Sequence, residues 1–173
     1  MRAFGLLAAP ILLAALAMPS AAEQKLPINP QVDYAGFNRL VGELAPVREA
    51  HRLQWAEFRR RSNNRNALLL DARSPAAFAS GHIRGAVNLP FSDFTDDALR
   101  EVIGRNPDRP IYIYCNNNFS DNIYPVVTKR VELALNIPTF INLHGYGYRN
   151  VWELADVVKT RDLGADWVSN RAR

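Results

Sequence analysis

The sequence predicts one small α/β domain, with a central parallel sheet of about five strands and helices on both faces. Short apolar runs alternate along the chain with segments in which apolar residues recur at helical spacing. Capping residues, glycines and prolines separate these segments. Such alternation is typical of a parallel sheet covered by helices on both sides. A chain of 173 residues is long enough for one domain with a real core.

The first 22 residues are typical of a secretory signal peptide. Arg2 gives a positive start, an apolar stretch covers residues 5–18, and Ala21 and Ala22 fit the small-residue rule for cleavage. The alternative is a membrane anchor, but the stretch contains Pro10 and is shorter than the roughly 20 residues of a spanning helix. We therefore expect cleavage after Ala22, a periplasmic or secreted protein, and no stable membrane insertion afterwards.

The rest of the chain divides into three parts. Residues 23–50 are expected to form a polar lead and a helix, because apolar residues recur at helical spacing over 34–50. Residues 51–159 are expected to form the main domain. Residues 160–173 form a polar tail that we expect to be loosely ordered, although Trp167 is large enough to pack back.

Within the main domain the expected elements follow in order. Short strands are expected at residues 52–54, 67–70, 86–89, 111–114 and 139–143. Helices are expected at residues 55–61, 75–79, 96–103 and 123–135, with a last one opening at Asn150. Ser74 and Thr95 have the composition of N-caps, and Glu153 stands three residues after Asn150 at capping-box spacing.

Cys115 is the single cysteine and directly follows the apolar run 111–114. It cannot form a disulfide within the chain, so it is buried and inert, paired with another chain, or a working thiol. Its place at the carboxyl end of a parallel strand, where binding sites form, favours the working thiol. The backbone N–H groups of the following loop and the positive end of the next helix would stabilise a thiolate. We therefore expect its pKa to fall below the roughly 8.5 of a free cysteine.

Several stretches resemble the rhodanese family. The segment 71–75 and the run Gly-His-Ile-Arg-Gly-Ala-Val-Asn-Leu-Pro at 81–90 resemble the front half of its domain. The run Tyr-Ile-Tyr-Cys at 112–115 resembles the strand that leads to its active-site cysteine, and 143–147 with Trp152 resembles its late glycine turn and tryptophan. The resemblance covers about residues 52–158.

The resemblance implies a rhodanese-like α/β fold and sulfur transfer. Cys115 would be the catalytic nucleophile, forming a persulfide and passing the outer sulfur to another nucleophile. The loop after it would bind the substrate through Asn116, Asn117, Asn118, Phe119, Ser120, Asp121 and Asn122. No cofactor is implied. The expected partners are a sulfur donor and an external thiol acceptor, small or carried by another protein, because the chain has no resolving cysteine.

The loop also departs from the family pattern. Residues 116–122 contain no arginine or lysine, and Asp121 adds a negative charge, so thiosulfate, a dianion, should be attracted poorly. The loop is longer than in sulfurtransferases, as in phosphatase relatives, but Asp121 stands where those need an arginine for phosphate. Two functions stay open: a sulfurtransferase with another donor, and a rhodanese-fold binding module with weak or no catalysis.

The charged residues and the histidines limit the expected partners and metal sites. The formal net charge is +4, and the run Arg59–Arg61 with Arg65 is typical of a solvated helix face. Export argues against nucleic acid as a partner. The three histidines show no metal-ligand spacing with Cys115, so no metal site is expected. Asp71 and Arg73 are expected to form a structural ion pair.

Overall fold

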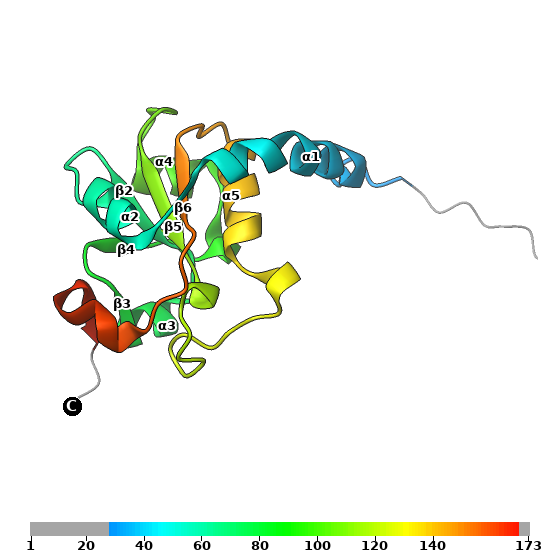
Figure 1. Ribbon diagram of the computed structural model, residues 1–173. Coiled ribbons are helices and arrows are strands. Elements are labelled where there is room, and N and C mark those ends of the chain that lie inside the picture. The colour runs from blue at the N-terminus through cyan, green and yellow to red at the C-terminus, as the bar shows by residue number, and fades with distance from the viewer. Residues whose placement is uncertain (1–27, 170–173) are drawn as a thin grey trace, which may run out of the picture. The chain divides into compact units, whose positions relative to one another are not determined.

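The computed structural model describes residues 28–169 (Figure 1). Of these, residues 28–32 belong to a separate unit, and the domain begins at Asp33. The expected signal peptide, residues 1–22, lies outside the described residues. Among residues 28–169, no helix is both long enough and apolar enough to cross a membrane.

A five-stranded parallel sheet forms the centre of the domain. Its order is β1-β6-β5-β2-β4, and every neighbouring pair is parallel. The strands are β1 (Arg52–Leu53), β2 (Leu68–Asp71), β4 (Ala86–Asn88), β5 (Ile111–Tyr114) and β6 (Val151–Leu154). The expected α/β class and the five-stranded sheet are therefore confirmed.

Helices cover both faces of this sheet, as Figure 1 shows. One core lies between the sheet and α1 (Tyr34–Ala50), α4 (Asp96–Ile103) and α5 (Asn136–Gly145). Alternate strand residues such as Ile111 and Ile113 point into it. The intervening residues, such as Tyr112, point into a second core under α2 (Trp55–Ser62). Because the strands are buried on both sides, they read as continuous apolar runs.

Local signals set several helix ends as expected. Ser74 Oγ accepts a hydrogen bond from the Ala77 N–H at the start of α3 (Pro75–Ser80). Thr95 Oγ1 accepts from the Ala98 N–H in the same way at the start of α4. These caps satisfy donors that have no partner in the first turn of a helix.

In the second half of the domain, three expected elements differ from the observed ones. Residues 123–135 were expected to form a helix but are irregular, apart from one 3₁₀ turn, η3 (Val131–Leu133). The expected strand 139–143 lies inside α5, and the helix expected from Asn150 is β6. An apolar run as short as 139–143 fits a buried helix as well as a strand. Pro138 lies in the first turn of α5, where proline is tolerated.

The C-terminal segment is ordered as far as Ser169, which corrects the expectation of a loose tail. It forms a 3₁₀ segment, η4 (Thr160–Asp166), and then β7 (Trp167–Ser169). Strand β7 pairs antiparallel with β3 (Gly81–Ile83) in a second, two-stranded sheet. Trp167 packs back as expected, with its ring centroid 5.2 Å from that of Phe119.

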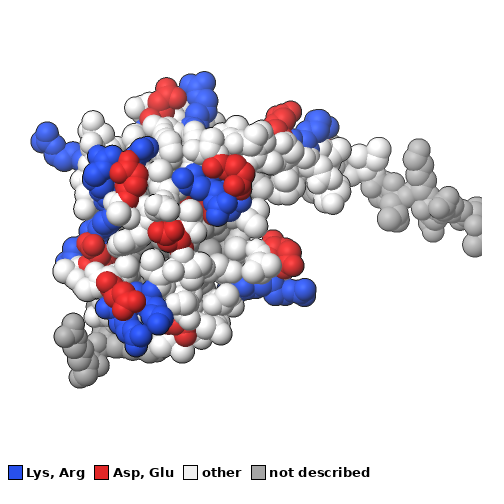
Figure 2. Space-filling view, in the orientation of Figure 1, with Lys and Arg blue, Asp and Glu red and all other residues white. Residues whose placement is uncertain are grey.

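Charges of both signs are interspersed on the face shown in Figure 2. The arginine run of α2 is paired rather than free. Arg59 Nη2 lies 2.7 Å from Asp166, and Arg60 and Arg61 both contact the carboxylate of Glu57. Arg60 is exposed, as expected for a solvated helix face, whereas the Arg59 side chain is only 14% exposed.

Candidate active site

Cys115 lies at the carboxyl end of β5 and opens the loop that follows. Its side chain points to the same sheet face as Ile113, toward α5, and the residue is only 1% exposed. The next residues wind into a 3₁₀ turn, η2 (Asn116–Asn118). This turn directs the Asn117 N–H back to the Cys115 sulfur, at 3.4 Å. The sulfur is thus buried at the edge of the sheet where binding sites of parallel sheets form.

Burial raises the pKa of the Cys115 thiol, contrary to the expectation of a lowered value. Desolvation is the largest cause, because it disfavours the charged thiolate. The backbone N–H groups of Asn117, Asn136 and Leu135 act in the opposite direction, and the carboxylate of Glu153 raises the pKa further. A helix end does contribute to the site as expected, but it is the start of α5 rather than a helix at 123–135.

The Asn118 side chain holds the loop that follows Cys115 in place. Its Oδ1 accepts hydrogen bonds from the Cys115 backbone N–H at 2.9 Å and from Asn136 Nδ2 at 3.0 Å. Its Nδ2 donates to the carbonyl oxygens of Leu154 and Asp156 after β6. The side chain is buried and its hydrogen bonds connect three segments, so Asn118 supports the backbone at Cys115 rather than facing a substrate.

The other loop residues also have structural contacts. Asn117 exchanges two hydrogen bonds with the backbone of Lys129, and Phe119 is buried against Tyr114 and Trp167. Asp121 accepts from the Thr160 N–H. Ser120 and Asn122 are exposed, and Asn122 adopts φ 47° and accepts from the Thr128 N–H. The residues expected to bind substrate therefore do not converge as one cradle.

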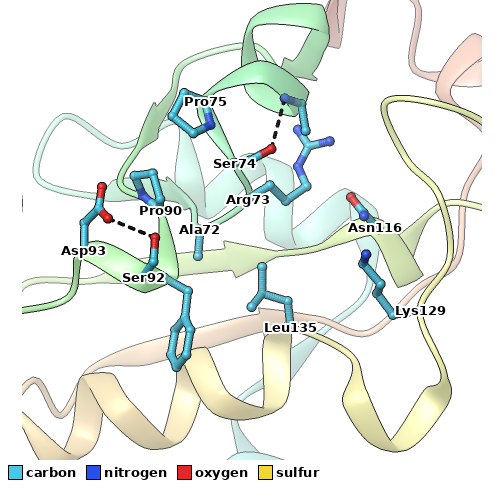
Figure 3. A pocket seen from close by; sticks show the side chains of 12 residues that line it. Ala72, Arg73, Ser74, Pro75, Pro90, Ser92, Asp93, Asn116, Lys129 and Leu135 are labelled. Atoms are coloured by element: carbon cyan, nitrogen blue, oxygen red, sulfur yellow. Dashed lines mark hydrogen bonds between the residues drawn. The ribbon is translucent and has the colours of Figure 1, made fainter.

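A cavity of about 390 Å³ opens beside the loop (Figure 3). It lies beyond the carboxyl ends of β2, β4 and β5 and is lined by Ala72, Arg73, Ser74, Pro75, Ala77, Pro90, Phe91, Ser92, Asp93, Asn116, Lys129 and Leu135. Of loop residues 116–122, Asn116 is the one that lines it, and its Oδ1 has no hydrogen-bond partner. Figure 3 shows Asn116 and Lys129 on one side and Asp93 on the opposite side.

Lys129 was missed by the sequence analysis. It was assigned to an expected helix over 123–135, outside the loop, whereas the irregular chain folds back and pairs it with Asn117. The Lys129 side chain therefore lines the cavity, on the same side as Asn116. The available signal was the adjacent pair Lys129-Arg130, soon after an amide-rich run that contains no cationic residue.

The expected ion pair of Asp71 and Arg73 is confirmed and fully buried. Arg73 Nη2 lies 2.6 Å from Asp71 Oδ2, and its guanidinium also donates to the carbonyl oxygens of Gly81 and Pro125. Tyr114 donates its hydroxyl hydrogen to Asp71 Oδ2 at 2.6 Å, and burial raises its pKa well above the usual value. Although Arg73 borders the cavity, these partners neutralise and fix its charge, so it is poorly placed to bind a dianion.

Residues 54–156, more than half of the chain, match the family described as the Rhodanese-like domain. The chain belongs to the rhodanese-like family. The expected family is thereby confirmed, and this rhodanese-like domain carries Cys115 at the end of its central strand. Helix α1 and strand β7 lie outside the matched residues.

Similar proteins come from several bacteria. The protein YqhL of Bacillus subtilis, described as uncharacterized, is 40% identical over 58 residues, which is 34% of this chain and 43% of YqhL. The chain therefore spans less than half of that relative. The BH2092 protein of Bacillus halodurans has a TM-score of 0.45 at 15% identity, over 71% of this chain and 75% of that one. The polysulfide-sulfur transferase homodimer of Wolinella succinogenes has a TM-score of 0.42 at 14% identity, over 75% and 82%.

Proposed function

We propose that this rhodanese-like domain is a sulfurtransferase in which Cys115 carries the transferred sulfur as a persulfide. The observation that supports this most directly is the hydrogen bond from the Asn117 N–H to the Cys115 sulfur at 3.4 Å, to which the backbone N–H groups of Leu135 and Asn136 add by lowering the pKa of the thiol. Such donors favour a negative charge on sulfur, whether on a thiolate or on a persulfide. They therefore oppose the effect of burial at the atom that would react.

The proposed reaction needs no cofactor and no net oxidation. The Cys115 thiolate attacks the outer sulfur of a donor persulfide, R–S–SH. A new S–S bond to Cys115 forms as the donor's S–S bond breaks, and the donor leaves as the thiolate R–S⁻. An acceptor thiolate then attacks the outer sulfur on Cys115, which releases the acceptor persulfide and restores the Cys115 thiolate. The acceptor comes from outside because Cys115 is the single cysteine.

The charges around the cavity support a donor other than thiosulfate. Residues 116–122 contain no cationic side chain, and Arg73 is neutralised by Asp71. Lys129 adds one positive charge, while Asp93 adds a negative one on the opposite side. A singly charged small persulfide, or a persulfide on a protein, suits this balance better than a dianion. Since Cys115 is 1% exposed, the donor reaches the sulfur only after a local movement that uncovers it.

Intact-mass measurement of the purified protein tests this proposal. The reduced, folded protein would be mixed separately with thiosulfate, glutathione persulfide and polysulfide, with Cys115→Ser treated in parallel. We expect the mass of one added sulfur atom with glutathione persulfide, little or none with the dianions thiosulfate and polysulfide, and none in the variant. No gain with any donor would contradict the proposal and favour a rhodanese-fold binding module instead.

We further propose that the protein is exported, because residues 1–22 have the composition of a signal peptide. N-terminal sequencing of the protein recovered from a periplasmic or secreted fraction tests this. A chain that starts at Glu23 is the expected result, and an intact chain confined to the cytoplasm contradicts it.

A further inference from the structure

A continuous chain of hydrogen bonds connects helix α1 to the nucleophile. Arg48 of α1 donates from Nε and Nη2 to the two carboxylate oxygens of Glu153, both at 2.6 Å. Asn136 Nδ2 donates to Glu153 Oε1 at 3.2 Å and to Asn118 Oδ1 at 3.0 Å. Asn118 Oδ1 in turn accepts from the Cys115 N–H at 2.9 Å. Its first member, Arg48, lies outside the residues that match the family.

The buried carboxylate of Glu153 needs Arg48 as its counter-charge. Glu153 is only 4% exposed and faces the same core as α1 and α5. A buried carboxylate is costly unless a cation and further donors satisfy it. Arg48 supplies both the charge and two parallel hydrogen bonds, which is the strongest geometry for such a pair. Without Arg48, one negative charge would remain close to the sulfur.

Asn136 connects the Arg48–Glu153 ion pair to the Cys115 sulfur through its backbone as well as through its side chain. Its side chain bridges Glu153 and Asn118, while its backbone N–H, in the first turn of α5, faces Cys115. The orientation of this N–H therefore depends on the partners of the Asn136 side chain. Any movement of the Glu153 carboxylate would be transmitted to the start of α5.

We infer that Arg48 is a positioning residue for Cys115, which neutralises Glu153 and so holds the start of α5 against the sulfur. Helix α1 would then be part of the device that makes the thiol reactive. The inference rests on the proposed function only in taking Cys115 as the reacting group. Loss of Arg48 should disfavour the Cys115 thiolate in two ways. It leaves a negative charge near the sulfur, and it loosens an N–H group that favours the thiolate.

Other charged groups near this network are already paired elsewhere. Glu49 lies beside Arg48 at 3.6 Å but on the solvent side. His51 bonds through Nδ1 to the Val151 carbonyl oxygen, and its ring stacks on Trp152. The groups around the loop are also engaged: Asp156 accepts from the Trp55 N–H, the backbone of Lys129 is bonded to Asn117, and Asp71 is paired with Arg73. Among the described residues, Arg48 and Asn136 are the side chains that bond the Glu153 carboxylate.

The test is a pH titration of the Cys115 thiolate in the full chain, followed by its ultraviolet absorbance, with Cys115→Ser as the blank. The variants are Arg48→Met, Glu153→Gln and the double variant. Arg39→Met is the matched control, because Arg39 is on the same helix and 68% exposed. We expect Arg48→Met to raise the midpoint by about one pH unit, Glu153→Gln to lower it, and the double variant to fall between the two single variants.

The direction of the shift separates this role from a structural one. If Arg48→Met only loosened the fold, solvent would reach the thiol and move its midpoint down, toward that of a free cysteine. A downward shift, or a midpoint like that of Arg39→Met, would overturn the inference. Because this readout needs no sulfur donor, its failure is distinct from failure of the persulfide experiment on the unaltered protein.

Discussion

The side-chain amide oxygen of Asn118 accepts a hydrogen bond from the backbone N–H of Cys115 at 2.9 Å. The same oxygen accepts from Asn136 at the start of α5, and the Asn118 amide nitrogen donates to two carbonyl oxygens after β6. One buried side chain therefore sets the path of the chain on both sides of the sulfur. The Cys115 loop keeps its shape through this amide rather than through a regular following helix.

Replacing Asn118 with alanine should destabilise the protein by about 1–3 kcal/mol. The change leaves the Cys115 N–H and the carbonyl oxygens of Leu154 and Asp156 without their partner in a buried environment. Chemical denaturation of the purified variant measures this loss.

Asn116→Ala is the matched control for that change. Asn116 belongs to the same 3₁₀ turn, but its Oδ1 has no hydrogen-bond partner. We expect a distinctly smaller loss of stability than for Asn118→Ala. Equal losses from the two variants would show that the hydrogen bonds of Asn118 are not what holds the loop.

The raised pKa of Cys115 predicts a specific dependence of stability on pH. When a folded-state pKa lies above the unfolded value, the unfolded chain loses its proton first as pH rises. The stability is therefore complete below the ordinary value of roughly 8.5 and falls as pH increases from there through the folded pKa. Denaturation midpoints of the reduced protein, measured from neutral pH upward, should decline over this range.

Cys115→Ser should show a shallower decline just above that value, because serine does not titrate there. Tyr114 also has a raised pKa, but an ordinary tyrosine titrates near 10.0, so its effect begins at higher pH. Identical profiles for the two proteins in the lower part of the range would contradict a raised Cys115 pKa.

The sequence predicted the features that local signals determine. The strand before Cys115 is a continuous apolar run, and Ser74 and Thr95 cap their helices through bonds to residues three positions away. Glu153 shows why the elements after Cys115 were predicted wrongly. Its spacing from Asn150 suggested a capping box, yet its carboxylate is bound by Arg48, 105 residues away in sequence, and it lies on a strand. A partner at that distance leaves no periodicity to read.

The same limit applies to the site itself. The position of Cys115 could be predicted because it depends on a strand end. The role of Lys129 could not, because it arises where an irregular segment folds back on the loop. The roles of Asn118 and Asn136 could not either, because their side chains bond to segments that are distant in sequence. The raised pKa of Cys115 likewise depends on its burial in the folded domain, which sequence spacing does not reveal.

Lys129→Gln should slow sulfur transfer from anionic donors by about two- to fivefold, the effect of losing one partly screened charge. Lys129 lines the cavity, while its backbone contacts with Asn117 do not depend on the side chain. The rate of persulfide formation would be followed by intact mass for an anionic and an uncharged donor. The difference between variant and parent should shrink at high salt.

Arg130→Gln provides the control for Lys129, since the neighbouring side chain is 82% exposed and does not line the cavity. We expect its rates to match those of the parent protein. If both changes slow the reaction equally, the effect comes from the general surface charge and not from the cavity. If Lys129→Gln slows an uncharged donor just as much, the side chain acts through the loop's structure.

The contact between Gly81 and Trp167 gives a last prediction, on the C-terminal segment that lies beyond the matched family residues. A Cβ at Gly81 would lie 2.7 Å from Trp167 Cζ2 and 3.1 Å from Pro125 Cγ, so Gly81→Ala forces the indole away from the β3 strand. Overpacking of this kind costs about 1–3 kcal/mol. Gly42→Ala, in α1 with nothing within 4 Å of its Cβ, should instead stabilise the protein by about 0.5–1 kcal/mol. Thermal and urea denaturation of the two variants compares these opposite signs. A neutral Gly81→Ala would mean that the Trp167 indole is not packed against Gly81 in solution.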